Sequence, residues 1–340
     1  MTSTALIFGV SGQTGSYLAH LLLGKGYRVV GTSRDAEING FPNLLRLGIK
    51  DRVQLRSISL SDFRSVLATI QEISPDEIYN LAGQSSVALS FDRPAETFES
   101  IAMATLNILE CLRFDKRRAR LFNATSSDCF GTIESPANEN TAFRPQSPYG
   151  MAKAAAFWSV VSYRHSYGIF SSNGILSNHE SPLRPNRFVT RKIITAANRI
   201  AGGSGEKLVL GDLSVERDWG WAPDYAEAMW RIMHHDVAAD FVVATGKVSS
   251  LQSFVDAAFR QFRLDWRDHV EVDTRLFRPS EIQRVQLDPS RIAATLGWRA
   301  RIAMPDLVET LVAAERNGDL GPLPWQDGKI ADQIPTASRT

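Results

Sequence analysis

The hydrophobic pattern in the first half of the chain alternates between two kinds of segment. Short apolar runs rich in β-branched and aromatic residues, typical of buried strands, are separated by longer stretches with helical periodicity. The predicted strands are Thr4–Phe8, Tyr27–Thr32, Glu77–Leu81, Ala119–Ala124 and Phe170–Leu176. The predicted helices are Ser16–Leu23, Asp62–Ile73, Glu96–Leu112 and Ser147–Tyr167. This alternation predicts an α/β fold with a doubly wound parallel sheet and right-handed crossovers.

The alternation of strands and helices breaks after about Asn178. Prolines punctuate longer loops from there onward, which predicts a smaller C-terminal lobe. Within this part, Val215–Thr245 again has the pattern of a helix followed by a strand, which we expect to return to the main sheet. The predicted units are a main domain of residues 1–177 and 215–247, a second lobe of residues 178–214 and 248–317, and a loosely held tail, 318–340.

Charge and composition are balanced over the 340 residues. Lys and Arg number 38 against 37 Asp and Glu, so no global charge attracts the chain to nucleic acid or to an anionic membrane. The N-terminus lacks the basic-then-apolar pattern of a signal peptide, and no apolar run approaches the roughly 20 residues of a membrane span. Cys111 and Cys129 do not make a disulfide framework, and the adjacent His234 and His235 predict no metal site. We expect a cytoplasmic protein that binds neither nucleic acid nor membrane.

A glycine-rich turn, Gly9-Val-Ser-Gly12-Gln-Thr-Gly15, directly follows the first predicted strand. Glycines let backbone amides approach a phosphate closely, and the N-terminus of the next helix favours negative charge. A tight strand-to-helix connection would use the same glycines, so both interpretations stay open at this point. At the end of the second strand, Arg34 stands where an acidic residue would hold a ribose 2′-hydroxyl. Arg34 favours a 2′-phosphate, and hence NADP over NAD, although Asp35 is its neighbour.

Tyr149 and Lys153 are four residues apart in Ser147-Pro-Tyr-Gly-Met-Ala-Lys153, within a predicted helix. That spacing places both side chains on one face of the helix, one turn apart. A phenol with a pKa of about 10 is a poor base at neutral pH, and an adjacent ammonium lowers that pKa by stabilising the phenolate. The pair therefore predicts proton transfer during catalysis.

These two motifs resemble those of the extended short-chain dehydrogenase/reductase family, and longer strings are similar to segments of its GDP-mannose 4,6-dehydratase subfamily. The strings in the second half of the chain are the more specific ones, since generic family members share only the first lobe. The resemblance covers nearly the whole chain and implies a Rossmann-like NADP-binding domain with a lobe that binds a nucleotide sugar. The similar strings are Ile78–Ser85, Ser147–Lys153, Asn173–Pro182, Phe188–Lys192, Arg217–Gly220 and Phe277–Glu281.

The resemblance also implies a set of binding residues. Those expected to contact the cofactor are Gly9, Gly12, Gln13, Thr14, Gly15, Arg34, Ser59, Leu60, Leu81, Ala82, Gly83, Ser85, Tyr149, Lys153, His179 and Arg184. Those expected to contact a GDP-sugar are Ser85, Asn178, Val189, Lys192, Arg217, Arg278 and Glu281. The chemistry agrees, because a diphosphate needs several cations and sugar hydroxyls need an acceptor such as Glu281. Without the resemblance, three basic residues so far apart in sequence would be interpreted as separate surface charges.

In the reaction that the resemblance implies, Tyr149 removes the C4 hydroxyl proton of GDP-mannose as hydride passes from C4 to NADP, and Lys153 holds the ribose. A carboxylate then removes the acidified C5 proton, the C6 hydroxyl leaves as water, and the hydride returns to C6. The family carries the required hydroxyl and carboxylate in a Thr-Ser-Glu string. Here the matching string is Ser126-Ser127-Asp128, so we expect Ser126 and Asp128 in the catalytic group.

Asp128 is the main departure from the family pattern, because its carboxylate is one methylene, about 1.5 Å, shorter in reach than that of Glu. This departure leaves one alternative open, a GDP-4-keto-6-deoxy-mannose reductase, which needs no C5 base. A second alternative is a nucleotide-sugar-binding protein without turnover, against which the intact pair of Tyr149 and Lys153 speaks. Ser59-Leu60 and Glu96 also replace residues that commonly meet the cofactor, namely an Asp-Leu pair and a Tyr. The loop Arg34–Pro42 lacks the second Arg and the serine run that tetrameric members use across their interface. We expect a homodimer, with a homotetramer as the alternative.

Overall fold

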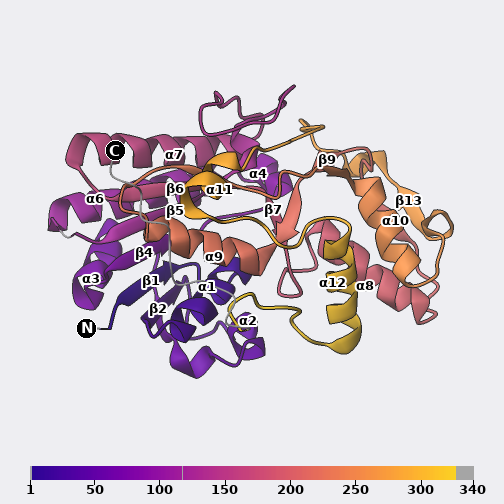
Figure 1. The fold of residues 1–340 in the computed structure, drawn as a ribbon, viewed down its shortest axis with the longest axis horizontal. Helices are drawn as coiled ribbons and strands as arrows, with labels where there is room; N and C mark the ends of the chain where they lie inside the picture. Colours follow the sequence, from indigo (N-terminus) through magenta and orange to yellow (C-terminus); the bar gives the residue numbers. More distant parts are fainter. Residues whose placement is uncertain (1, 117, 327–340) are drawn as a thin grey trace.

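The structure is a computed structural model that describes residues 2–116 and 118–326. In this part of the chain the main sheet has seven strands, all parallel, in the order β11-β6-β5-β4-β1-β2-β3 (Figure 1). The strands are β1 (Thr4–Phe8), β2 (Arg28–Ser33), β3 (Gln54–Ser57), β4 (Glu77–Asn80), β5 (Arg120–Ser126), β6 (Ser171–Leu176) and β11 (Phe241–Val243). The predicted doubly wound parallel sheet is confirmed.

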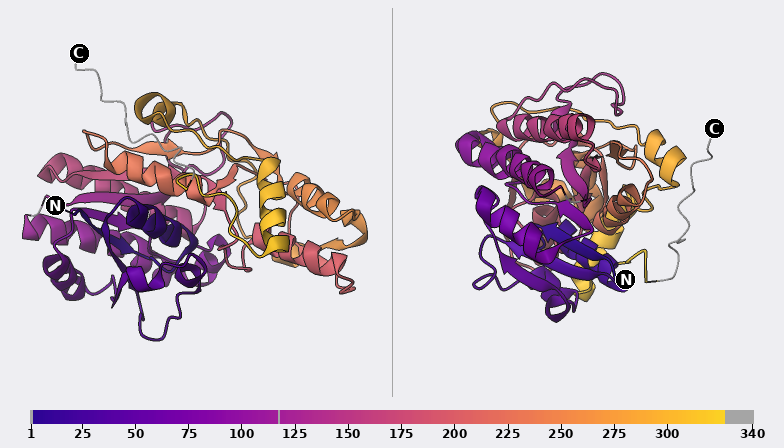
Figure 2. Two further views of the ribbon diagram at one scale, coloured as in Figure 1. Left: turned by 60° about the horizontal axis from the view of Figure 1, so that its bottom comes forward. Right: turned by 90° about the vertical axis from the view of Figure 1, so that its left-hand side faces the viewer.

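Helices cover both faces of this sheet (Figure 2). On one face lie α3 (Phe63–Ile73), α6 (Ala104–Asp115) and α7 (Pro148–Tyr167), and on the other lie α1 (Gln13–Gly24) and α9 (Ala222–Met233). Successive side chains of a strand point to opposite faces, and β1 shows the consequence: Leu6 and Phe8 join one buried cluster, while Ala5 and Ile7 join the other. Strands buried on both faces are nearly continuously apolar, which is why their runs were visible in the sequence.

The smaller lobe has a helical core of its own. It is built from α8 (Val189–Ala201), α10 (Leu251–Gln261) and α12 (Asp306–Asn317), which pack around a separate buried cluster. Short two-stranded pairings accompany them. These pairings are β7 (Asn178–Glu180) with β10 (Trp219–Trp221), β9 (Glu216–Arg217) with β12 (Ser249–Ser250), and β8 (Leu208–Leu210) with β13 (Val270–Val272).

The segment Val215–Thr245 contributes α9 and β11, and β11 pairs with β6 at the edge of the main sheet. The helix expected at Glu96–Leu112 is divided into α5 (Pro94–Phe98), a π-helical turn at Glu99–Met103, and α6. Strand β3, the short α2 (Pro42–Arg46) and α4 (Val87–Asp92) have no counterpart in the expected elements. Strand β3 escaped notice because it is a largely exposed edge strand without an apolar pattern.

Two segments near the C-terminus differ from expectation. Helix α11 (Ser290–Leu296) lies in the range assigned to the second lobe, yet it packs on β11 and adds Ile292 and Leu296 to the main core. The tail is not loosely held between residues 318 and 326, because Leu323 is buried and Trp325 Nε1 donates to His20 Nδ1 at 2.8 Å. Aromatic anchors of this kind carry no periodicity, so the sequence pattern did not reveal them. Residues 327–340 of the predicted tail lie outside the described residues.

Three further observations concern the cysteines, membrane-spanning helices and metal-binding groups. Cys111 and Cys129 are both free and buried. Among residues 2–116 and 118–326, no helix is long and apolar enough to cross a bilayer. The same residues contain no group of three or more His, Cys, Asp or Glu side chains that could hold a metal ion.

Candidate active site

Several of the expected site residues lie where neighbouring strands of the main sheet end. Gly9 follows β1, Leu81 follows β4, and Ser126 closes β5, and these strands are adjacent in the sheet. The carboxyl ends of parallel strands meet at one edge, where doubly wound folds bind their ligands. The fold therefore brings together the glycine turn, the Leu81–Ser85 segment and the turn at Ser126–Asp128.

The glycine turn has the geometry of a phosphate cradle. Gly9 has φ +87°, and a Cβ there would lie 2.9 Å from the backbone nitrogen of Ala82. A Cβ at Gly15 would lie 2.5 Å from the carbonyl oxygen of Gly9. Helix α1 starts after Gly12 without a side-chain cap, so its first N–H groups are open to an anionic ligand. These residues fit a dinucleotide diphosphate.

Residues of β7 hold this turn from the other side. Gln13 Nε2 donates to the carbonyl oxygen of His179 at 2.8 Å, and Arg184 Nη1 donates to the same oxygen at 2.8 Å. His179 Nδ1 lies 2.9 Å from the carbonyl oxygen of Ser177, which can only accept, so Nδ1 carries the ring proton. His179 Nε2 then accepts from Thr14 Oγ1 at 2.8 Å. Burial lowers the pKa of His179 to about 4, so the ring is neutral at physiological pH.

The residues expected near the adenosine end are spread over a more open surface. Arg34 follows β2, and its side chain is 87% exposed, with Nη1 lying 3.9 Å from Glu96 Oε1. Glu96 Oε2 also pairs with Arg93 Nη1 at 3.3 Å. Ser59 Oγ lies 2.9 Å from Ser61 Oγ, and the carbonyl oxygen of Leu60 accepts from Asn107. Glu96, which stands where the family commonly has a Tyr, therefore places its carboxylate next to Arg34, the residue expected to bind a 2′-phosphate.

The four expected catalytic residues come from β5 and the start of α7. Ser126 is the last residue of β5, Asp128 lies in the following 3₁₀ turn, and Tyr149 and Lys153 lie in the first turns of α7. Gly150 lets the helix approach this turn closely, because a Cβ there would lie 2.8 Å from the carbonyl oxygen of Asp128. Lys153 is buried and donates from Nζ to the carbonyl oxygen of the strand residue Ala124 at 2.7 Å.

Burial shifts the pKa values of both Tyr149 and Lys153. Burial raises the pKa of the phenol, and the negative charge of Asp128 adds to this rise, while a hydrogen bond with Ser126 opposes it. Burial also lowers the pKa of Lys153 to about 8, and its ammonium lies 5.9 Å from the centre of the Tyr149 ring. Desolvation therefore opposes the lowering of the Tyr149 pKa that is expected from Lys153.

Asp128 faces a cluster of charged residues from the smaller lobe. Glu281 Oε1 accepts from Arg217 Nη2 at 2.7 Å and from Arg278 Nη1 at 3.1 Å. Burial raises the pKa of Asp128, and the positive charges of Arg217 and Arg278 oppose this rise. Both arginines thus act at the same place as the expected C5 base. The interpretation as separate surface charges is wrong for this pair, which shares one carboxylate.

The other residues expected on the substrate side are placed by backbone structure. Asn178 begins β7 and lies beside Trp219 of β10 in the register of the two strands. Val189 is the first residue of α8, and Lys192 on the same helix donates from Nζ to the carbonyl oxygen of Val209 at 2.7 Å. Ser85, in the segment after β4, is exposed. The ammonium of Lys192 is therefore bonded to the backbone of β8 rather than to Glu281.

One buried residue behind the site was not identified from the sequence. Asp218 accepts from Ser177 Oγ at 3.0 Å and from the backbone N–H groups of Thr245 and Gly246. It thereby ties the strand that carries Arg217 to the loop after β11. Asp218 lies within the Arg217–Gly220 string, but the donors that make it important are distant in sequence, so spacing gave no signal.

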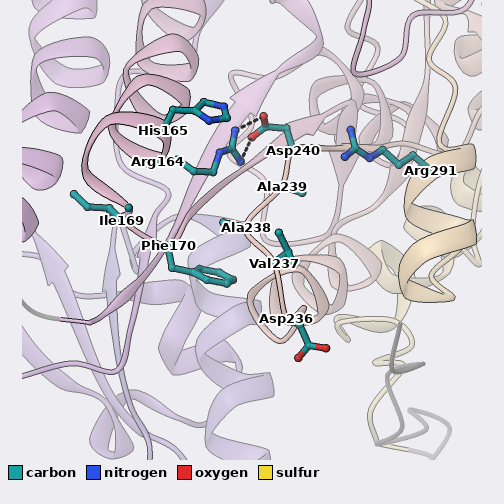
Figure 3. A pocket seen from close by; sticks show the side chains of 11 residues that line it. Arg164, His165, Ile169, Phe170, Asp236, Val237, Ala238, Ala239, Asp240 and Arg291 are labelled. Carbon is teal, nitrogen blue, oxygen red and sulfur yellow. Dashed lines mark hydrogen bonds and ion pairs between the residues drawn. The ribbon is translucent and has the colours of Figure 1, made fainter. Parts of the chain in front are cut away.

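A separate hollow lies at the opposite, amino edge of β6 and β11 (Figure 3). Its lining includes His165 and Arg291, and its charged centre is the pair of Arg164 Nη2 and Asp240 Oδ2 at 2.6 Å. Asp240 Oδ1 also accepts from the side-chain nitrogen of Asn173 at 2.9 Å. These bonds join the end of α7 to strand β6, so the charge pair has a structural role in holding the helix on the sheet.

The sequence was also compared with protein families and with known proteins. The family model for GDP-mannose 4,6 dehydratase matches residues 6–311. GDP-mannose 4,6 dehydratase 2 of Arabidopsis thaliana is 42% identical over 318 residues, covering 91% of this chain and 85% of that protein. GDP-mannose 4,6-dehydratase of Sinorhizobium fredii is 40% identical over 333 residues, covering 91% of this chain and 95% of that protein.

A solved structure extends the agreement to the fold. The UDP-glucose 4-epimerase of Thermus thermophilus, in complex with NAD, has a TM-score of 0.80 and 23% sequence identity, and the match covers 92% of this chain and 99% of that one. At this level of identity the likeness concerns the fold alone. It extends over both lobes, in keeping with an extended short-chain dehydrogenase/reductase. The family model and the two relatives go further, and the chain belongs to the GDP-mannose 4,6-dehydratase family.

Proposed function

We propose that this chain is a GDP-mannose 4,6-dehydratase, which converts GDP-D-mannose to GDP-4-keto-6-deoxy-D-mannose with internal recycling of NADP. The observation that carries the proposal is the meeting of two groups at one edge of the sheet. The first turn of α7, which carries Tyr149, packs through Gly150 against the backbone of Asp128, and Arg217 and Arg278, joined by Glu281, act electrostatically on the Asp128 carboxylate. Proton-transfer groups and diphosphate-binding cations therefore share one site.

The oxidation half of the reaction uses the residues of α7. A bound nicotinamide cofactor supplies the hydride acceptor for C4 and later the hydride donor for C6. Tyr149 takes the proton of the C4 hydroxyl, with Ser126 as its hydrogen-bond partner. Lys153 presents its ammonium from the floor of the site, where the carbonyl oxygen of Ala124 fixes it. The glycine turn would hold the diphosphate of the cofactor, with His179 and Arg184 beside it.

Asp128 performs the elimination half. Once C4 is a ketone, the C5 proton is acidic, and Asp128 takes it; the protonated carboxyl then returns this proton to the C6 hydroxyl, which leaves as water as the C5–C6 double bond forms. Burial favours this role because it raises the pKa of the carboxyl, which makes the carboxylate a stronger base than an exposed Asp. The positive charges of Arg217 and Arg278 oppose that rise.

The diphosphate of the GDP-sugar binds at Arg217 and Arg278. Their shared partner Glu281 orients both guanidinium groups, and an arginine fork matches phosphate oxygens with two parallel hydrogen bonds. Asn178 and Val189, the first residues of β7 and α8, are the proposed contacts for the rest of the sugar nucleotide, and so is Lys192 on α8, where it is bonded to β8. The sugar then reaches toward Asp128 at the edge of the main sheet.

A single incubation tests the proposal. GDP-mannose is mixed with the protein and a catalytic amount of NADP, and the product is analysed by mass spectrometry. Loss of one water per GDP-mannose over many turnovers is the expected result. Unchanged GDP-mannose would contradict the dehydratase assignment.

The short carboxylate of Asp128 favours a second candidate, the NADPH-dependent GDP-4-keto-6-deoxy-mannose reductase. That reaction needs Ser126, Tyr149 and Lys153 but no C5 base. NADPH consumption separates the two functions, because a dehydratase regenerates its cofactor while a reductase oxidises one NADPH per product. Stoichiometric NADPH oxidation with the 4-keto sugar, together with no water loss from GDP-mannose, would support the reductase.

NADP is the proposed cofactor because Arg34 follows β2, where an acidic residue would otherwise hold a ribose hydroxyl. The guanidinium can bond a 2′-phosphate with two parallel contacts. Its neighbour Glu96 opposes this preference, since a carboxylate 3.9 Å from Arg34 also repels a phosphate bound there. Dissociation constants for NADP and NAD, measured side by side, test the preference.

We also propose that the chain forms a homodimer through α7. Met151, Ala155, Trp158 and Ser162 are exposed at helical spacing along this helix, and Met103 is exposed on the adjoining π-helical turn. This uncharged stripe suits the same stripe of a second copy across a two-fold axis. Light scattering after size exclusion is expected to show a dimer, or a tetramer built from it. Trp158→Glu should give monomers, whereas Val237→Glu, at an exposed apolar residue outside this stripe, should leave the assembly intact.

A further inference from the structure

Glu180 is a buried carboxylate that lies between the two halves of the proposed site. It ends β7, which Figure 1 shows between the main sheet and the helices of the smaller lobe, and it is 2% exposed. Its Oε2 accepts from Thr190 Oγ1 at 2.6 Å and forms an ion pair with Arg184 Nε at 3.0 Å. A buried charge is costly unless it is paired and hydrogen-bonded, so this carboxylate constrains both partners.

The Arg184 side of this carboxylate belongs to the cofactor half. Arg184 Nη1 donates to the carbonyl oxygen of His179, which also accepts from Gln13 in the glycine turn. Arg184 is therefore held against the loop that we expect to bind the diphosphate of the cofactor. An anion bound there would draw the guanidinium toward itself, and Glu180 would feel the change through the ion pair.

The Thr190 side belongs to the substrate half. Thr190 is the second residue of α8 and is buried, and Val189 and Lys192 on the same turn are expected to contact the sugar nucleotide. Phe188, the N-cap of α8, has its ring 4.0 Å from the Arg184 guanidinium. The start of α8 is thus tied to Arg184 twice, once through Glu180 and once through Phe188.

We infer that Glu180 is a positioning residue through which cofactor bound at Arg184 and a sugar nucleotide bound at α8 strengthen each other's binding. The inference rests on the proposed function, because it takes both molecules as ligands of this site. One carboxylate oxygen serves both partners, so ordering Arg184 orders the first turn of α8. Thermodynamic linkage requires the effect to be reciprocal.

The experiment measures the dissociation constant of GDP-mannose by calorimetry, without and with saturating NADPH. This pair cannot react as a dehydratase complex, because the hydride acceptor is already reduced. In the wild-type protein, NADPH should tighten GDP-mannose binding by about fivefold or more. Thr190→Val, which removes the hydroxyl that meets Glu180, should bring this ratio close to one, and so should Glu180→Gln.

Matched variants separate positioning from general damage. Thr190→Ser keeps the hydroxyl and should restore the ratio. Thr195→Val removes another buried hydroxyl of α8, one that donates to the helix's own backbone, and should leave the ratio unchanged. A purely structural role would lower the melting temperature and weaken both ligands without changing the ratio.

Each outcome is decisive. A wild-type ratio of one, or an undiminished ratio in both Thr190→Val and Glu180→Gln, would overturn the inference while each ligand alone still binds. If GDP-mannose or NADPH alone fails to bind the wild-type protein, the proposed function itself fails. The two failures are therefore distinguishable in one data set.

Discussion

The cofactor half and the substrate half of the site are built in different ways. The cofactor half is made chiefly of backbone from consecutive residues, the turn Gly9–Gly15, whose shape follows from where glycine is required. The substrate half is made of side chains from separate segments, such as Arg217 and Glu281, which are 64 positions apart. One half is defined by local conformation and the other by tertiary contacts.

This difference predicts which substitutions each half of the site tolerates. A backbone cradle is destroyed by an added Cβ but is indifferent to many neighbouring side chains, because its donors are N–H groups. A cluster such as Arg217, Glu281 and Arg278 depends on each charge, since removing Glu281 leaves the buried Arg217 and the half-buried Arg278 without their shared partner. Tyr149 and Asp128 lie where the halves meet, so substitutions there should separate the two chemical steps.

The largest expected effect is that of Tyr149→Phe. The ring still fills its place, but the oxygen that takes the C4 proton is lost, so turnover should fall by about 10³-fold. GDP-mannose binding, measured by calorimetry, should remain nearly unchanged because the ionic cluster is intact. Substantial remaining turnover would show that another group takes this proton.

Asp128→Asn should come next, with turnover reduced by about 10²-fold. The amide keeps the shape but cannot accept the C5 proton, so the 4-keto intermediate should accumulate without release of 6-deoxy product. Solvent deuterium exchange at C5 measures this step separately from hydride movement. Asp128→Glu is the matched control, since it keeps the base and restores the reach common in the family. Undiminished C5 exchange in Asp128→Asn would assign the base elsewhere.

Much of the cofactor half could be predicted from the sequence, because its signals are local. The apolar run of β1, the glycines and the spacing of Tyr149 and Lys153 all lie within short windows, and the structure places them at one edge of the sheet. Strand β3 was not predicted because it is largely exposed and its sequence has no apolar pattern.

The substrate half could be expected only from resemblance. Nothing in the spacing of Arg217 and Glu281 says that they form an ion pair, and Glu180 and Asp218 become important only through partners that the fold supplies. The desolvation that raises the Tyr149 pKa could not be predicted either, because it depends on tertiary contacts. Burial, unlike spacing, cannot be determined from a short window of residues.

A smaller effect is expected for Arg217→Gln, which tests the ionic half alone. Loss of a charged hydrogen-bond donor should weaken GDP-mannose binding by about 10- to 100-fold. NADP binding should be unaffected, because the glycine turn is separate from this cluster. Arg217→Lys keeps the charge but not the two-pronged geometry and should fall between the two. Equal losses for both ligands in calorimetry would mean that the halves are not independently built.

The smallest effect is expected for Arg34→Ala, at the open end of the cofactor half. Arg34 is exposed, so solvent screens its charge, and the dissociation constant for NADP should rise by only about 10-fold while that for NAD stays unchanged. Glu96→Gln is the complementary variant, because it removes the carboxylate that faces Arg34 and should shift the preference further toward NADP. Both constants can be measured by quenching of intrinsic tryptophan fluorescence. A wild-type preference for NAD, or an NADP constant unmoved by Arg34→Ala, would show that this cation does not bind the 2′-phosphate. The rest of the cofactor half would then have to bind the dinucleotide through its backbone cradle alone.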